Sequence, residues 1–165
     1  TEGDAVLAPV FAAIGQATIK SFGSDAPTLW CEPGRAMVSD ALWLLLRVKA
    51  RDGATLYLND GLYGALGEWR DMPVPGGRVA FDTKGRERVG TGCAFTVFGP
   101  TCDSLDRIPE SWDLPETIAE NDYILLRSAG AYSTALVTGF NGYGTRHMMN
   151  LGSVVDATGQ GCLAG

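Results

Sequence analysis

The feature that most constrains the fold is a series of short apolar runs separated by turn dipeptides. Arg51-Asp52-Gly53 and Asn141-Gly142 are turn signals of the kind that join antiparallel strands, and Asp60-Gly61 also turns the chain. The runs that favour strands lie at 41–50, 55–59, 91–98, 123–127, 135–140 and 147–155. This pattern predicts a mainly β protein, a sandwich or barrel with a helix packed at one end.

Three other stretches complete the predicted element order. Residues 5–20 carry the one clear helical pattern, and since Pro9 fits only a first turn, the regular helix is expected to start near Ala8. Residues 28–32 form a short run of strand type that ends at Pro33. Residues 78–88 are polar and are expected to be exposed, and 114–121 is expected to be a connecting turn.

Composition excludes several function classes. The chain of 165 residues carries a net charge of -6, and its pI is about 4.7, which argues against a nucleic-acid-binding surface. Its longest apolar run, near 41–46, is too short to span a membrane. One histidine and four widely spaced cysteines make a metal site improbable, and free thiols favour a cytoplasmic location.

Two motifs carry reactive groups next to predicted strand ends. In the stretch 98–106, Gly99-Pro100 ends a strand, and Cys102 and Asp103 follow side by side on a loop. Considered alone, the same stretch also fits a plain turn with a half-buried cysteine. In Glu32-Pro33-Gly34-Arg35 the arginine is suited to hold a phosphate or carboxylate, but a surface turn with a Glu–Arg pair fits as well.

Taken together, five segments resemble a known family, because they occur in its order. They are Glu32-Pro33-Gly34-Arg35, residues 58–64, residues 98–106, Gly130-Ala131-Tyr132 and residues 140–143. The chain resembles the C-terminal half of the pyridoxal-phosphate-dependent decarboxylases of the alanine-racemase fold. Because Asp103 rather than Glu follows Cys102, the resemblance is to the ornithine and lysine type rather than the diaminopimelate type.

The resemblance implies a cofactor site for pyridoxal 5'-phosphate. Glu32 would hydrogen-bond the pyridine nitrogen and keep the ring protonated, which makes the ring a better electron sink. Arg35 would hold the phosphate with its planar fork, helped by the Gly34 backbone and the Tyr132 hydroxyl.

The resemblance also implies roles on the substrate side. Cys102 would return a proton to the substrate carbon, and Asp103 would pair with the distal ammonium of a basic amino acid. In the family these two residues reach into the active site of the other subunit, and Tyr63 and Phe140 match positions that line this shared pocket. The implied assembly is a homodimer.

The activity implied is decarboxylation of ornithine to putrescine and CO2 in polyamine biosynthesis, with lysine and arginine left open as substrates. A second substrate-binding acid is expected at Asp71 or Glu68, and the sequence does not choose between them. The alternative is a non-catalytic, decarboxylase-like regulatory or binding protein.

The resemblance assigns residues 1–35 to the last helix and strand of a β/α barrel and 36–165 to the C-terminal β-domain. The family's cofactor-binding lysine lies in the earlier part of that barrel, and none of Lys20, Lys49 and Lys84 matches it. The chain is therefore expected to be a piece of a larger enzyme, to need the missing N-terminal barrel segment, and to be inactive alone.

Overall fold

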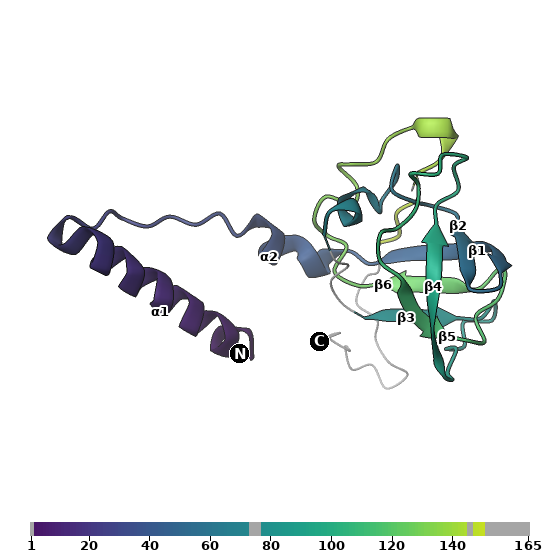
Figure 1. Cartoon of the computed structure of the whole chain (residues 1–165), viewed down its shortest axis with the longest axis horizontal. Helices are drawn as coiled ribbons and strands as arrows, with labels where there is room; N and C mark the ends of the chain where they lie inside the picture. Colours follow the sequence, from purple (N-terminus) through teal and green to yellow (C-terminus); the bar gives the residue numbers. More distant parts are fainter. Residues whose placement is uncertain (1, 73–76, 145–146, 151–165) are drawn as a thin grey trace. The chain divides into compact units, whose positions relative to one another are not determined.

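The chain forms two compact units in a computed structural model that describes residues 2–72, 77–144 and 147–150 (Figure 1). The first unit is Thr1–Pro33 and the second is Gly34–Gly165. The division falls two residues before the boundary predicted after residue 35. The assignment of the first part to the end of a β/α barrel stays a prediction.

The first unit consists of one long helix and a short tail. The helix α1 spans Glu2–Phe22 with Pro9 inside it, so it begins six residues before the predicted start. The short 3-10 helix η1, Gly23–Asp25, follows. The strand predicted at 28–32 is wrong, because residues 26–33 have no regular structure. A strand is held by hydrogen bonds to a neighbouring strand, and the described part of this unit contains no strand with which residues 28–32 could pair.

The second unit opens with two short helices and continues as a six-stranded sheet. The helices are α2, Gly34–Val38, and the 3-10 helix η2, Ser39–Ala41. The strands are β1 (Leu44–Asp52), β2 (Thr55–Leu58), β3 (Arg78–Phe81), β4 (Gly92–Phe98), β5 (Trp112–Pro115) and β6 (Tyr123–Leu126). Their order in the sheet is β3-β6-β1-β2-β4-β5, and every pair is antiparallel except β2–β4.

The β1–β2 hairpin follows from the pattern read in the sequence. Leu44, Leu46 and Val48 are buried and alternate with exposed neighbours, as expected for a strand with one face on the core. Asp52 pairs with Thr55 across the turn, and Gly53 has a φ of 54°, a conformation that glycine adopts without steric cost. The predicted hairpin at Arg51-Asp52-Gly53 is confirmed.

The sheet curls until its two edge strands, β3 and β5, contact each other, which makes it a nearly closed barrel. In Figure 1 the β4–β5 pair runs steeply across β6 and β3. Arg78 on β3 joins the edges, because its guanidinium carbon lies 5.0 Å from the ring centroid of Trp112 on β5. The predicted mainly β barrel fold is confirmed.

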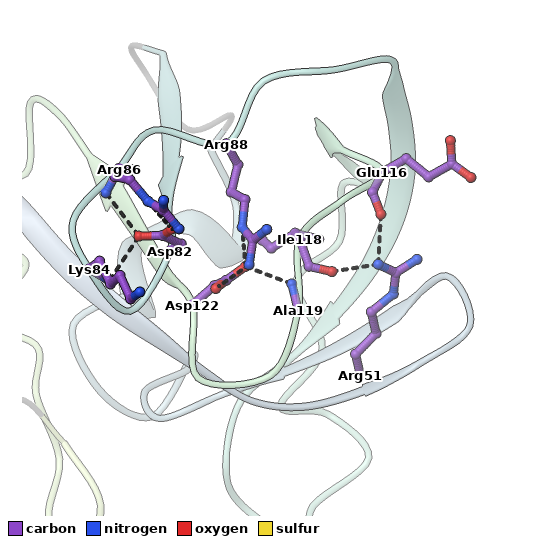
Figure 2. Close-up of polar contacts among 9 residues, drawn as sticks. All are labelled: Arg51, Asp82, Lys84, Arg86, Arg88, Glu116, Ile118, Ala119 and Asp122. Carbon is purple, nitrogen blue, oxygen red and sulfur yellow. Dashed lines mark hydrogen bonds and ion pairs between the residues drawn. The ribbon is translucent and has the colours of Figure 1, made fainter.

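Polar side chains tie the connecting loops to this barrel (Figure 2). Arg51 at the end of β1 donates to the backbone oxygens of Glu116 and Ile118 in the loop after β5. Arg88 donates to both oxygens of Asp122, at 2.9 and 3.0 Å. These contacts hold the segments that follow β3 and β5 against the barrel.

The core fills the inside of the barrel. Its largest fully buried side chains come from all strands except β3, which contributes the buried Ala80, and from three connecting loops. They are Trp112, Phe95, Leu46, Leu56, Leu58, Leu66, Ile108, Leu114, Ile118, Ile124, Leu126 and Val48.

Four further sequence predictions are corrected. Residues 78–88 are not simply a polar exposed segment, since β3 lies there and pairs with β6. Strand β5 includes the first residues of the predicted connecting turn at 114–121. The predicted strand at 135–140 does not form; the chain there is irregular and ends in the 3-10 helix η4, Phe140–Gly142. Of the strand predicted at 147–155, residues 147–150 are irregular and 151–155 lie outside the described residues.

Within the described ranges, no helix has both the length and the apolar character that crossing a bilayer requires. Among the same residues, no three metal-ligating side chains gather closely enough to hold an ion.

Candidate functional site

The loop after β4 presents Cys102 at the surface because the loop closes on itself. The Gly99 N–H donates to the Asp106 carbonyl at 2.7 Å, and the Asp106 N–H donates to the Asp103 carbonyl at 3.0 Å. Beyond the loop, Ile108 rejoins Val97 with an N–H···O bond of 2.9 Å. Pro100 removes a donor at the strand end, so the ladder stops and the thiol and carboxylate follow on the exposed turn.

A second turn brings Tyr63 to the same place. The Asp60-Gly61 turn, predicted from the sequence, is held by the Asp60 carboxylate, which accepts from the Gly61 N–H at 2.9 Å and the Ala65 N–H at 3.2 Å. Tyr63, in the middle of this turn, donates its phenol proton to the Asp103 carboxylate. The sequence separates the two residues by 40 positions, and the fold makes them partners.

The Tyr63–Asp103 hydrogen bond changes the acid–base properties of both groups. It raises the pKa of Tyr63, because the phenol gives up its proton less readily while it donates to a carboxylate. It also lowers the pKa of Asp103, helped by the Leu105 N–H and by the charge of Arg70. Arg70 lies with its guanidinium carbon 5.8 Å from the centroid of the Tyr63 ring. Asp103 is therefore ionised at neutral pH.

The helix η4 covers the other side of this group. The Phe140 ring packs on the Tyr63 ring with 4.6 Å between centroids, and Asn141 donates to the Cys102 sulfur at 3.7 Å. Figure 1 shows η4 at the end of the barrel toward which the β4 arrow points. Four residues that the sequence singled out, Tyr63, Cys102, Asp103 and Phe140, thus form one cluster, which we call the thiol cluster.

Arg35 and Tyr132 also meet, in what we call the arginine cluster. The Arg35 guanidinium carbon lies 5.2 Å from the centroid of the Tyr132 ring. Arg35 also pairs with Glu68: one Nη donates at 2.8 Å and the other binds the second carboxylate oxygen. The hydrogen bond to Glu68 raises the pKa of Arg35 further.

The 3-10 helix η3, Gly67–Arg70, connects the two clusters. Glu68 on η3 reaches Arg35, and Arg70 on the same turn lies over Tyr63. The buried Trp69 between them anchors η3 on the core. One turn of chain thus determines where both clusters lie.

The chemistry of the arginine cluster fits a phosphate. Phosphate oxygens take charge-assisted bonds from a guanidinium and bonds from a hydroxyl, and Arg35 and Tyr132 supply both from adjacent positions. The Arg35 side chain is 39% exposed, so part of its fork remains open to an anion although Glu68 holds two of its N–H groups.

Two predicted site residues are not joined to these clusters within the described structure, and a third lies in the first unit. Asp71 is exposed, and in the described part of the chain only its backbone N–H is bonded, to the Glu68 carbonyl at 3.4 Å. Gly34 begins α2, where a Cβ would have open space around it within the described structure. Glu32 is exposed in the first unit. The roles of these residues stay predictions.

Sequence reasoning missed two residues of the site and the partner of a third. Glu68 was considered only as a solvated or substrate-binding acid, and its position three residues before Asp71 gave no sign of the pair with Arg35. Asn141 was read as half of a hairpin turn, and its amide instead reaches Cys102. Asp106 is the last residue of the 98–106 motif, and the sequence analysis gave it no role. Its place next to the apolar Leu105, where the chain returns to the sheet, could have marked it as a residue that holds the loop.

Comparison with known proteins assigns the fold to a family. Residues 36–130 match the model of the pyridoxal-dependent decarboxylase C-terminal sheet domain. "Decarboxylase flvG" of Aspergillus flavus is 36% identical over 126 residues, which are 68% of this chain and 30% of that protein. Ornithine decarboxylase of Schizosaccharomyces pombe is 35% identical over 135 residues, 73% of this chain and 30% of that protein.

Solved structures agree. Arginine decarboxylase of Paramecium bursaria Chlorella virus bound to agmatine superposes with a TM-score of 0.60 and 29% identity, covering 80% of this chain and 36% of that one. Lysine/ornithine decarboxylase of Vibrio vulnificus complexed with putrescine gives a TM-score of 0.57 and 29% identity, over 85% of this chain and 36% of that one. The chain thus spans about a third of the length of these relatives. It belongs to the pyridoxal-dependent decarboxylases, with the barrel of its second unit as their C-terminal sheet domain.

Proposed function

We propose that this chain is the C-terminal part of a pyridoxal-phosphate-dependent decarboxylase of a basic amino acid, ornithine before lysine or arginine, which releases putrescine and CO2 for polyamine biosynthesis. The observation that carries the proposal is the thiol cluster, in which an exposed thiol, an ionised carboxylate and two aromatic rings come together from three distant segments. Each member suits one requirement of the reaction.

Asp103 provides recognition of the substrate. A basic amino acid carries a second cation at its far end, and an ionised carboxylate in a half-buried position pairs with such a cation. The Tyr63 ring lies next to the carboxylate and packs against Phe140, and the two rings would offer an apolar surface to the substrate's methylene chain. The Tyr63 hydroxyl orients the carboxylate, because it occupies one of its oxygens.

Cys102 provides the proton. Loss of CO2 leaves a carbon that must be protonated, and a thiol can donate because its ordinary pKa lies close to neutral pH. The Asn141 amide holds the sulfur from the η4 side. When bound, the cofactor supplies the electron sink that makes the loss of CO2 possible.

The arginine cluster would hold that cofactor. Arg35 and the Tyr132 hydroxyl would bind its phosphate, the Gly34 backbone would approach it, and Glu32 would bind its ring nitrogen. We take Asp71 as the second substrate acid, since the Glu68 carboxylate is already paired with Arg35.

The rest of the enzyme would come from outside this chain. Lys20 lies in α1, Lys49 faces solvent on β1, and Lys84 lies in the turn after β3, and none of the three matches the family's cofactor-binding lysine. We propose that the N-terminal barrel segment supplies the cofactor-binding lysine, that the chain alone is inactive, and that two complete chains share their sites in a homodimer. Cys31, Cys93 and Cys102 are free, which supports a cytoplasmic location.

The names of the relatives support the substrate class. The relative from Schizosaccharomyces pombe is called an ornithine decarboxylase, and the related structures were solved with agmatine and putrescine. All three names refer to basic amino acids or to the amines formed from them. The choice among ornithine, lysine and arginine depends on the distance between Asp103 and the reacting carbon. That distance is defined only in the complete site, to which the N-terminal barrel segment would contribute.

The test is a decarboxylation assay on the complete enzyme, with this chain joined to its N-terminal segment. We expect wild type to release CO2 and amine from ornithine, and Cys102→Ala to lose amine formation by roughly 10²- to 10⁴-fold. Bound cofactor, read from its absorbance, should remain, because Cys102 is not in the arginine cluster. Cys93→Ala, on the strand that leads to the same loop, is the control and should keep its activity. Full amine formation by Cys102→Ala would refute the role of the thiol.

One observation favours the non-catalytic alternative: the Arg35–Glu68 pair occupies part of the fork that the phosphate needs. A regulatory relative that does not bind the cofactor would show no cofactor absorbance in the complete wild-type protein and no amine from any of the three substrates. Absorbance without amine would instead point to a substrate outside the basic amino acids.

A further inference from the structure

The carboxylate of Asp106 lies between the two segments that build the thiol cluster. It is 1% exposed, although carboxylates are almost never buried without partners. One oxygen accepts from the Leu62 N–H at 2.7 Å, next to Tyr63. The other accepts from the Thr101 N–H at 3.1 Å and the Thr101 hydroxyl at 2.8 Å, next to Cys102. One side chain thus joins the Tyr63 turn to the Cys102 loop.

The backbone of Asp106 is equally fixed. Its carbonyl accepts from the Gly99 N–H at 2.7 Å, and its N–H donates to the Asp103 carbonyl at 3.0 Å. The first bond closes the base of the loop. The second bond is made to Asp103, whose carboxylate accepts the hydrogen bond from the Tyr63 hydroxyl. The carboxylate therefore projects from a rigid point, and its direction is determined.

Two glycines make room for this carboxylate. A Cβ added to Gly61 would lie 2.2 Å from one Asp106 oxygen, and a Cβ added to Gly99 would lie 2.3 Å from both. Neither glycine has a positive φ, so their requirement is for space and not for an unusual backbone. The Gly61 and Gly99 backbones therefore lie closer to the carboxylate than a residue with a Cβ would allow.

We propose that Asp106 is a positioning residue of the thiol cluster: it sets the separation of the Tyr63 turn and the Cys102 loop, and so decides whether the Tyr63 hydroxyl reaches Asp103. The effect of Asp106 on catalysis rests on the proposed function. Its effect on the distance between Tyr63 and Asp103 concerns this chain alone. Asp106 touches none of the reacting groups. It acts through Leu62 and Thr101, the neighbours of Tyr63 and Cys102.

The chemistry of Asp106 allows a substitution of nearly the same shape. An ionised carboxylate only accepts, and all three groups that face it donate. In Asp106→Asn, an NH2 replaces one oxygen and meets a donor, either at Leu62 or at Thr101. The side-chain volume hardly changes, so the loss falls on the link between the two segments and not on packing.

A matched control exists elsewhere in the barrel. Asp122 is also 1% exposed, and it accepts from Arg88 and from the Ala119 N–H at 2.7 Å (Figure 2). It contacts no residue of the thiol cluster within the described structure. Asp122→Asn therefore removes an equally buried carboxylate without a route to Tyr63.

The experiment is a titration of the tyrosines by NMR in the 165-residue chain, labelled with ¹³C in the tyrosine rings. Tyr63→Phe assigns the Tyr63 signal among the five tyrosines. We expect the Tyr63 midpoint of wild type to lie above the usual phenol value, and Asp106→Asn to shift it down toward that value, while Asp122→Asn leaves it in place. A folded Asp106→Asn chain with an unshifted Tyr63 midpoint overturns the proposal.

A second variant keeps the proposal testable if Asp106→Asn does not fold. Thr101→Val removes only the hydroxyl donor to Asp106 at a partly exposed position, and it should shift the Tyr63 midpoint in the same direction by a smaller amount. An unshifted midpoint in that folded variant overturns the proposal as well. The NMR titrations use the 165-residue chain and need no enzyme activity. Their outcome is therefore distinguishable from a failure of the proposed function. If it is active, Asp106→Asn should lower kcat by more than Asp122→Asn does.

Discussion

Asn121 has a backbone φ of 70°, in the left-handed region where an ordinary Cβ crowds the following carbonyl. Glycine adopts this conformation without that cost, because it has no Cβ. Asn tolerates this conformation better than most residues, and its side chain also accepts from the Arg47 guanidinium at 2.6 Å. We expect Asn121→Ala to be less stable than Asn121→Gly by about 1 kcal/mol.

Urea unfolding of the two Asn121 variants measures this difference. Both lose the bond to Arg47, so the comparison isolates the backbone. Equal stability of the alanine and glycine variants would mean that the turn adjusts its φ at no cost. Asn121→Gly itself should remain close to wild type, because the lost bond is exposed and contributes little.

At this scale the sequence predicted which side chains matter better than it predicted their partners. Tyr63, Cys102, Asp103 and Phe140 were named from motifs, and the structure brings them together. Pairs such as Glu68 with Arg35 were not foreseen, since the two residues are 33 positions apart and nothing local links them. Partners across such distances depend on the path of the chain, which a motif does not contain.

Among the elements, the turn after β3 depends on one carboxylate. The Asp82 carboxylate accepts from the backbone N–H groups of Lys84 and Arg86 at 2.8 and 3.0 Å, and from the Arg86 Nε at 2.7 Å (Figure 2). These bonds, chiefly those from the Arg86 backbone and side chain, lower the pKa of Asp82 to about 2. The ionised form thus stabilises the turn, and protonation removes that stabilisation.

The pH dependence of unfolding should show this. Because the folded pKa of Asp82 lies below its unfolded value of 3.8, its contribution is fully present above about pH 4. It should disappear as the pH falls through about 2. We expect wild type to exceed Asp82→Asn in unfolding free energy at neutral pH, and the gap to narrow between pH 4 and pH 2. Asp52→Asn, at an exposed hairpin, controls for the loss of one negative charge. A gap that stays constant down to pH 2 would contradict the assignment.

The accuracy of the element predictions followed the clarity of the apolar pattern and of the turns. The β1–β2 hairpin was predicted because nine residues of alternation end in Asp52-Gly53. Strand β3 was missed because it begins with Arg78 in a polar stretch and pairs with β6, which lies far along the chain. The run 135–140 was read as a strand for its apolar content, but Thr138 instead bonds the Tyr63 carbonyl at 2.9 Å and the segment covers the thiol cluster.

For the whole molecule, the main fact is that the barrel closes. Arg78 links the edge strands through Trp112 and through Glu110 at 3.9 Å. Burial lowers the pKa of Arg78, as expected for a cation largely removed from water. The β-barrel class followed from the turn signals, but its strand order, with β4 parallel to β2 in an otherwise antiparallel sheet, did not. Strand order depends on which distant strands meet, and periodicity along the chain carries no information on that.

The stability of the barrel should be independent of the first unit. Among the described residues, the buried core cluster lies between Leu44 and Ala129. The side chains of α1 from Leu7 to Phe22 are exposed or half-buried. We expect deletion of residues 1–33 to leave the unfolding midpoint of the second unit unchanged in urea, because no core residue is removed. Trp112→Ala in the same shortened chain is the comparison, and it should cost about 3–5 kcal/mol, since it empties a fully buried site in the middle of the barrel. A fall in the midpoint on deletion comparable to that of Trp112→Ala would show that α1 is part of the same cooperative unit.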